Sequence, residues 1–187
     1  DPHPPSAAGF ESRLRALGRA GLEVTSHACT FAELDAGVLD AAARFDVITF
    51  VHSLYYVGGV GEALTAAVDR LAPGGEVLVL HAPLGALNRV SDAHAPPVDG
   101  CRQPFSEEVA VEIDLLEASR SQVELAAVLD LSGCANSDPA LLEFTVQACL
   151  GEAERATVLA ELQAIAEPGP GLRVAHPVSA FVLQALP

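Results

Sequence analysis

The segment Phe45-Asp-Val-Ile-Thr-Phe-Val51, followed along the chain by Leu71-Ala-Pro-Gly-Gly-Glu-Val-Leu-Val-Leu80, decides the fold of this protein. Each segment holds a short apolar run bounded by polar or turn residues, which is typical of a strand buried on both faces of a parallel sheet. Between them, apolar residues recur at helical spacing, and Pro73-Gly74-Gly75 turns the chain into the second strand. The pattern predicts a βαβ unit over about 45–82.

Polar-tipped side chains follow the first of these strands, in the run His52-Ser-Leu-Tyr-Tyr56. In open sheets of this kind, ligands bind beyond the carboxyl ends of the parallel strands. A histidine there can accept a proton or bind a carboxylate, and the two tyrosines can line a pocket or bind a cationic amine. We therefore place the candidate site here. The alternative is a hydrogen-bonded histidine at a strand end beside ordinary core aromatic residues.

The segments before and directly after the βαβ unit have weaker patterns. We expect a helix over 8–20, a strand over 22–29 and a partly helical segment over 31–43. The Gly/Pro-rich stretch 83–104 shows little periodicity, and loops of this length are typically lids, binding loops or disordered segments.

The second half of the chain alternates helical and strand patterns. Ser106 as a cap, followed by two glutamates, predicts a helix over 106–118, and a strand follows over 121–131. Further helices are expected from 138, where Asp-Pro starts one, and over 152–166. The last strand is expected over 176–186. No interior linker is apparent, so we expect residues 1–187 to form a single domain.

Composition excludes several classes of partner. The formal net charge is −15, with ten basic residues that are scattered, whereas binding to nucleic acid needs clustered Lys and Arg. A small-molecule ligand suits this balance better. No apolar run reaches the length of a membrane helix. The four cysteines show no C-x-x-C spacing, so we expect reduced thiols, no metal site and a cytoplasmic protein.

The strand, helix, Pro-Gly-Gly and strand of residues 45–80 resemble the second half of class I S-adenosylmethionine-dependent methyltransferases. The closest resemblance is to histamine N-methyltransferase and its relatives, in which the fourth strand also runs into a Leu-Tyr-Tyr-Val segment, here Leu54–Val57. Methyltransferase domains of sulfoxide-synthase enzymes are another similar group. Further matches follow in the same order, at Ser106–Glu108, Leu129–Ser132, Leu141–Phe144 and Ser179–Val182.

The resemblance implies a Rossmann-like fold, with a mixed and mostly parallel sheet and helices on both faces. It implies S-adenosylmethionine as cofactor and transfer of a methyl group to a small amine or imidazole-type substrate. His52 and Tyr56 would orient that substrate, and Val51 and Tyr55 would adjoin the methyl donor.

Three further residues are implied as cofactor contacts. Thr30 and Phe31 follow the expected third strand, near where the adenine ring rests in the family. Asp1 resembles the acidic end of the family's second strand, whose carboxylate binds the ribose hydroxyls.

The sequence departs from the family in two places. It has no G-x-G-x-x-G or E/D-x-G-x-G motif, because Gly58–Gly61 follows the wrong strand, and we expect a fragment that lacks the first strand. It also has no tryptophan, and Pro177 stands where the family has an asparagine, so histamine itself is not the expected substrate. The alternative is a non-catalytic relic that does not bind S-adenosylmethionine. A dehydrogenase-like dinucleotide binder fits less well, since its phosphate-binding glycines are also absent.

Overall fold

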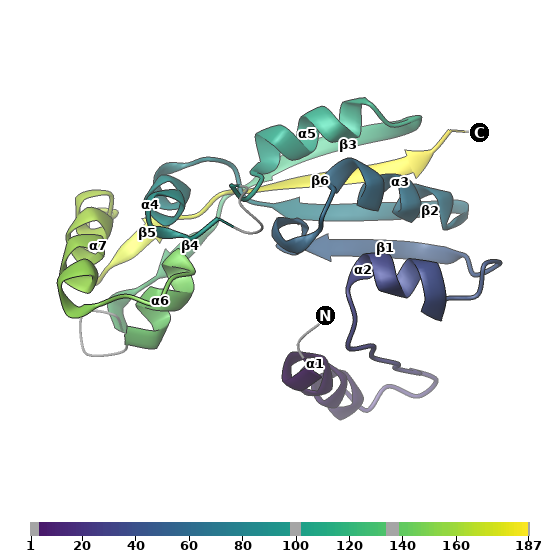
Figure 1. Cartoon of the computed structure of the whole chain (residues 1–187), viewed down its shortest axis with the longest axis horizontal. Helices are drawn as coiled ribbons and strands as arrows, with labels where there is room; N and C mark the ends of the chain where they lie inside the picture. The colour runs from purple at the N-terminus through teal and green to yellow at the C-terminus, as the bar shows by residue number, and fades with distance from the viewer. Residues whose placement is uncertain (1–3, 98–101, 134–138, 187) are drawn as a thin grey trace.

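The computed structural model describes residues 4–97, 102–133 and 139–186. Two lobes lie side by side, a four-stranded sheet with its helices and a smaller lobe (Figure 1). The helices are α1 (Pro4–Ala16), α2 (Phe31–Glu33), the π-helical turn η1 (Leu34–Val38), the 3₁₀ turn η2 (Leu54–Tyr56), α3 (Val60–Asp69), α4 (Ala86–His94), α5 (Ser106–Asp114), α6 (Pro139–Val146) and α7 (Glu152–Ala164). The strands are β1 (Phe45–Val51), β2 (Leu71–His81), β3 (Ala118–Leu125), β4 (Val128–Asp130), β5 (Arg173–Ala175) and β6 (Val178–Ala185).

The predicted βαβ unit is confirmed. Strands β1 and β2 pair in parallel, with Val51 opposite Leu80 at their carboxyl ends, and α3 is the crossover helix between them. Strand β2 begins at Leu71, so the Pro-Gly-Gly turn lies within its first part. Gly74 has φ +80° there, a conformation that glycine adopts without steric cost, and the register of the pair shifts nearby.

The sheet has the strand order β1-β2-β6-β3, and β6 is antiparallel to both of its neighbours. The expected mixed sheet is therefore confirmed. Two of its three pairings are antiparallel, however, so parallel pairing does not predominate among the described strands.

The helices of the sheet lobe cover one face of the sheet. Alternate strand residues point to this face, and Phe50, Val77, Val79, Phe181 and Leu183 pack there in one buried cluster. Helices α3 and α5 contribute buried side chains to the same cluster, and Phe31 of α2 packs at its edge.

The opposite face of the sheet is exposed. Val47 and Val51 of β1 are 58% and 54% exposed, and Val123 and Leu125 of β3 are also exposed. Among the described residues, the buried cluster under α3 and α5 lies on one face, so the expected helical cover is seen for that face. Helix α1, which packs only weakly, lies apart from the sheet (Figure 1).

The smaller lobe, formed by the β4–β5 ladder with helices α4, α6 and α7, has a core of its own. Because each lobe buries a separate cluster, the space between them is a natural place for a ligand. The buried residues of the smaller lobe's core are Leu87, Leu131, Leu142, Val146, Leu150, Val158, Leu162, Leu172 and Val174.

Three sequence expectations are wrong in detail. Residues 22–29 form no strand, because no described strand lies beside them to complete a ladder. The expected loop over 83–104 contains the nine-residue helix α4. The expected strand over 121–131 is divided into β3 and β4, which belong to different sheets.

The helix expected over 8–20 is present as α1, which has the same length and begins four residues earlier, and the segment expected over 31–43 is present in shorter form as α2 with η1. The helices expected over 106–118, from 138 and over 152–166 correspond to α5, α6 and α7, and the last strand to β6. None of the described helices is long and apolar enough to span a membrane.

Candidate functional site

A cavity of about 660 Å³ opens between the two lobes at the carboxyl ends of β1 and β2. Its size suits a small molecule. The sheet lobe supplies His52, Tyr55, Tyr56 and Phe105, and His176 lies between β5 and β6. The smaller lobe supplies Leu87, Asn88, Ser91, Asp92, Leu129, Leu141, Phe144, Thr145 and Gln147, and the intervening segment adds residues 95–97, 102 and 103.

His52 is placed in the cavity wall by an unusual backbone conformation. Its φ is +48°, in the left-handed region that non-glycine residues rarely adopt. The backbone N–H of His52 donates to the carbonyl of Leu80 at 2.9 Å, which holds this strained residue at the end of the parallel ladder. Such strain is commonly found at functional sites.

Four aromatic rings form a column that leads from the core to the cavity. The buried ring of His81 lies under Tyr55, with centroids 4.1 Å apart. Tyr55 is followed by His52, at 6.3 Å between centroids, and His52 stacks on His176 at 5.7 Å. This ring column (His81, Tyr55, His52 and His176) therefore joins the end of β2, the segment after β1 and the connection between β5 and β6.

Burial favours the neutral form of the three histidines of the ring column. Desolvation lowers the pKa of His81 from 6.5 to about 4, against the opposing effect of the bond from its Nε2–H to the Pro104 carbonyl, 2.9 Å long. Desolvation also lowers the pKa of His52, and the pKa of His176 is lowered by desolvation and by the nearby His52. Neutral imidazole can accept a proton or donate one hydrogen bond.

The two tyrosines have different environments. Tyr55 is part-buried, its hydroxyl accepts a long hydrogen bond of 3.4 Å from the Ala82 N–H, and burial raises its pKa. Tyr56 is 59% exposed, with its ring nearly perpendicular to that of Tyr55. Both line the cavity, as expected from their position after β1.

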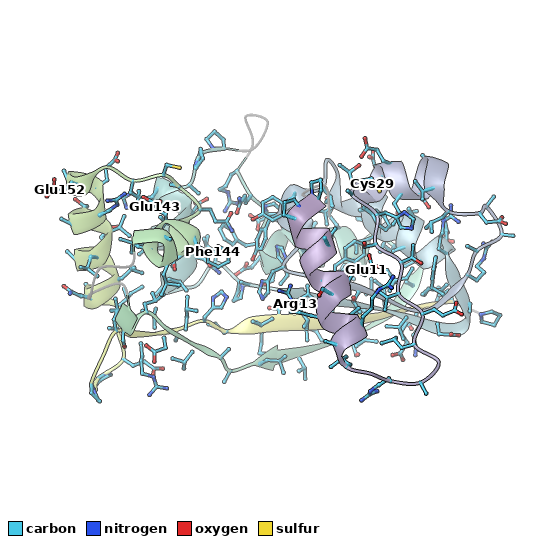
Figure 2. All side chains as sticks on the ribbon, turned by 90° about the horizontal axis from the view of Figure 1, so that it is seen from below. Glu11, Arg13, Cys29, Glu143, Phe144 and Glu152 are labelled. Atoms are coloured by element: carbon cyan, nitrogen blue, oxygen red, sulfur yellow. The ribbon has the colours of Figure 1, made fainter. Side chains whose placement is uncertain are left out.

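The smaller lobe contributes residues that the sequence did not indicate. The ring of Phe144 on α6 is 79% exposed and lies on the side of that helix that faces the sheet lobe (Figure 2). Asn88, Ser91 and Asp92 lie along one face of α4, spaced by about one helical turn. The sequence did not predict α4, because the helix lies in a Gly/Pro-rich stretch with little periodicity. Only the position of His176 before an expected strand could have pointed to that residue.

The two charged side chains that line the cavity, Arg102 and Asp92, differ in whether they form an ion pair. Arg102 forms an ion pair with Glu108 and lies over the ring of Phe105, with 5.1 Å between the guanidinium carbon and the ring centroid. Asp92 makes no ion pair within the described ranges. The cavity therefore carries one uncompensated negative charge when its histidines are neutral.

The residues expected to contact a cofactor are not gathered in this cavity, except for Tyr55. Thr30 caps α2, because its hydroxyl accepts from the Glu33 N–H at 3.2 Å. The ring of Phe31 packs edge-on against Phe50, with centroids 5.2 Å apart. Both residues thus have structural roles here. Val51 is exposed at the end of β1, and Asp1 lies outside the described residues.

Comparisons with known proteins give no match to any family model, and none to a curated protein. Several solved structures are similar. The YcgJ protein of Bacillus subtilis has 10% identity and a TM-score of 0.64, over 100% of this chain and 81% of that one. A candidate methyltransferase of Bacillus halodurans has 9% identity and a TM-score of 0.56, over 97% and 78%.

The N-methyltransferase NodS of Bradyrhizobium japonicum is also similar, with 14% identity and a TM-score of 0.50, over 100% of this chain and 71% of NodS. At such low identity these likenesses concern the fold. The protein has the Rossmann-like fold of these methyltransferases, as the resemblance of its sequence implied.

Proposed function

We propose that this protein is an S-adenosylmethionine-dependent N-methyltransferase that acts on a small amine or imidazole-type compound. One observation carries the proposal. In a fold shared with the N-methyltransferase NodS, the cavity lies at the carboxyl ends of the two parallel strands and is lined by His52, Tyr55 and Tyr56. This is the place where open α/β sheets bind ligands.

Methyl transfer requires little covalent chemistry from the protein's own side chains. S-adenosylmethionine, when bound, supplies an electrophilic methyl group on a sulfonium. The chain's own residues have to align the acceptor atom and exclude water. We assign to His52, whose pKa is lowered by burial, the receipt of the proton that an amine or ring N–H loses, and to Tyr56 the orientation of the acceptor by ring contact.

Few of the described residues can be assigned to contact with the methyl donor. Val51 is exposed at the strand end and Tyr55 adjoins the cavity, so these two are the residues we assign to donor contact. The structural roles of Thr30 and Phe31 favour a second candidate function, a methyltransferase-like relic that does not bind the donor.

Calorimetric titration of S-adenosylhomocysteine into the 187-residue chain separates the two candidates. Circular dichroism first verifies that the chain is folded. Micromolar binding, weakened by Tyr55→Ala and unaffected by Val111→Ala, is expected for the methyltransferase. Val111 is an exposed residue of α5 outside the cavity and serves as the matched control. A folded chain that binds no S-adenosylhomocysteine would contradict the donor assignment and favour the relic.

A further inference from the structure

His176 occupies a fixed position in the cavity wall. Its backbone N–H donates to the Ala127 carbonyl at 2.8 Å, which continues the β4–β5 pairing one residue beyond Val128 and Ala175. Its ring stacks on His52, with an angle of 23° between the ring planes. Both the backbone and the ring of His176 are therefore constrained before any ligand binds.

The two ring nitrogens of His176 have different surroundings. Nδ1 is buried and has no hydrogen-bond partner among the described residues. Nε2 is not among the described nitrogens that are buried without a partner, and the residue lines the cavity. A neutral imidazole carries a single N–H, on one nitrogen or the other. The surroundings of the two nitrogens therefore decide which tautomer is favoured.

A buried N–H without an acceptor is rarer in proteins than a buried acceptor without a donor. The tautomer that leaves a lone pair on Nδ1 and the hydrogen on Nε2 is therefore the favoured one. His81 of the same ring column has this tautomer, because its Nε2 must donate to the Pro104 carbonyl while Nδ1 has no partner within the described ranges. His176 thus presents a hydrogen-bond donor to the cavity.

We infer that His176 is a positioning residue for the methyl acceptor, and that its Nε2–H donates to a lone pair on that molecule. The inference rests on the proposed function. Since an atom that shares its lone pair with a donor is a poor nucleophile, the acceptor carries a second lone-pair atom besides the one that is methylated. Asp92 in the same cavity disfavours a carboxylate, so the second atom is an uncharged ring nitrogen or carbonyl oxygen.

The tautomer is tested directly by NMR. In the full chain labelled with ¹⁵N-histidine, long-range proton–nitrogen correlations distinguish a protonated nitrogen from one that bears a lone pair. At about pH 8, well above the ordinary histidine pKa, we expect the hydrogen of His176 on Nε2. A hydrogen on Nδ1 would overturn the inference.

Two variants test the donor role, because glutamine places its amide nitrogen near the position of Nε2 and asparagine near that of Nδ1. The probe is 1-methylimidazole, which has one accepting nitrogen, and the comparison ligand is N-methylpyrrole, which has the same shape and none. We expect the wild type and His176→Gln to bind 1-methylimidazole roughly fivefold more tightly than N-methylpyrrole, the effect of one hydrogen bond. His176→Asn should bind the two equally.

Equal binding of the two probes by the wild type, or a preference that persists in His176→Asn, would overturn the inference, as would a wild type that binds neither probe. His27→Gln is the matched control, since His27 does not line the cavity. Thermal unfolding of each variant verifies folding. If the probe preference holds but S-adenosylhomocysteine does not bind, the proposed function fails and His176 stays a ligand-positioning residue.

Discussion

The ring of Tyr55 lies over the buried imidazole of His81, with 4.1 Å between centroids and 33° between the ring planes. Tyr55 comes from the turn after β1, and His81 ends β2. The contact therefore joins the carboxyl ends of the two parallel strands. It also supports the cavity from beneath, because His81 is fully buried while Tyr55 reaches the cavity wall.

Burial of neutral His81 makes stability depend on pH. Its pKa is about 4 in the folded protein and 6.5 ordinarily, so between these values the unfolded chain binds more protons. The free energy of unfolding should therefore fall as the pH decreases through this window. The contribution of His81 is about 2 kcal/mol between about pH 7.5 and about pH 5.

Urea denaturation of His81→Phe at the same two pH values measures this contribution. The variant keeps a ring under Tyr55 but cannot titrate, so its stability should change less with pH than that of the wild type. Some dependence should remain, because the pKa values of His52 and His176 are lowered too. An unchanged pH dependence would show that His81 is not the group responsible.

Gly75 should be essential for the start of β2. A Cβ at this position would lie 2.7 Å from the Phe45 carbonyl oxygen and 3.0 Å from that of Ala72, and backbone cannot easily move away. We expect Gly75→Ala to lower the free energy of unfolding by about 3 kcal/mol. The matched variant Gly74→Ala meets no atom within 4 Å and should cost only the roughly 1–2 kcal/mol of its positive φ. Equal losses in urea denaturation would contradict this prediction.

Ser179 and Ser106 form a buried polar contact between β6 and α5. Their hydroxyl oxygens are 2.9 Å apart, and the Ser179 hydroxyl lies 2.6 Å from the Glu124 carboxylate. Ser179→Ala would leave the buried Ser106 hydroxyl without this partner, at a cost of about 1–3 kcal/mol in chemical denaturation. Ser119→Ala on the exposed strand β3 is the control and should change stability by less than about 0.5 kcal/mol.

Phe144 should serve ligand binding rather than folding. Because its ring is 79% exposed, Phe144→Ala should change the free energy of unfolding by less than about 0.5 kcal/mol. The same change should weaken binding of indole, a planar probe, by about twofold to tenfold. Since the chain has no tryptophan, indole fluorescence reports binding without interference. Unaltered indole binding would remove Phe144 from the site, and Val111→Ala again provides the control.

The local parts of the fold were predictable from the sequence. The apolar runs of β1 and β2, the helical spacing between them and the Pro-Gly-Gly turn depend on interactions between near neighbours in the chain, which leave a periodic pattern. The same pattern placed His52, Tyr55 and Tyr56 at a strand end, and all three line the cavity. The start of α5 near Ser106 was equally readable from its glutamates.

Features that depend on distant partners were not predictable. Residues 22–29 have strand-like alternation, but a strand also needs a neighbour to pair with. Ser106 was expected to cap α5, whereas its hydroxyl is buried against Ser179, far along the chain. Phe144 and His176 enter the cavity only because the smaller lobe lies beside the sheet.

The sequence by itself therefore determined the βαβ unit and which side chains stand at its carboxyl edge, since hydrophobic periodicity and turn residues act over short distances. Only the tertiary structure decided what faces those side chains. The ring column, the cavity and the buried Nδ1 of His176 arise from the packing of segments far apart in the chain, and no local pattern encodes which of them meet.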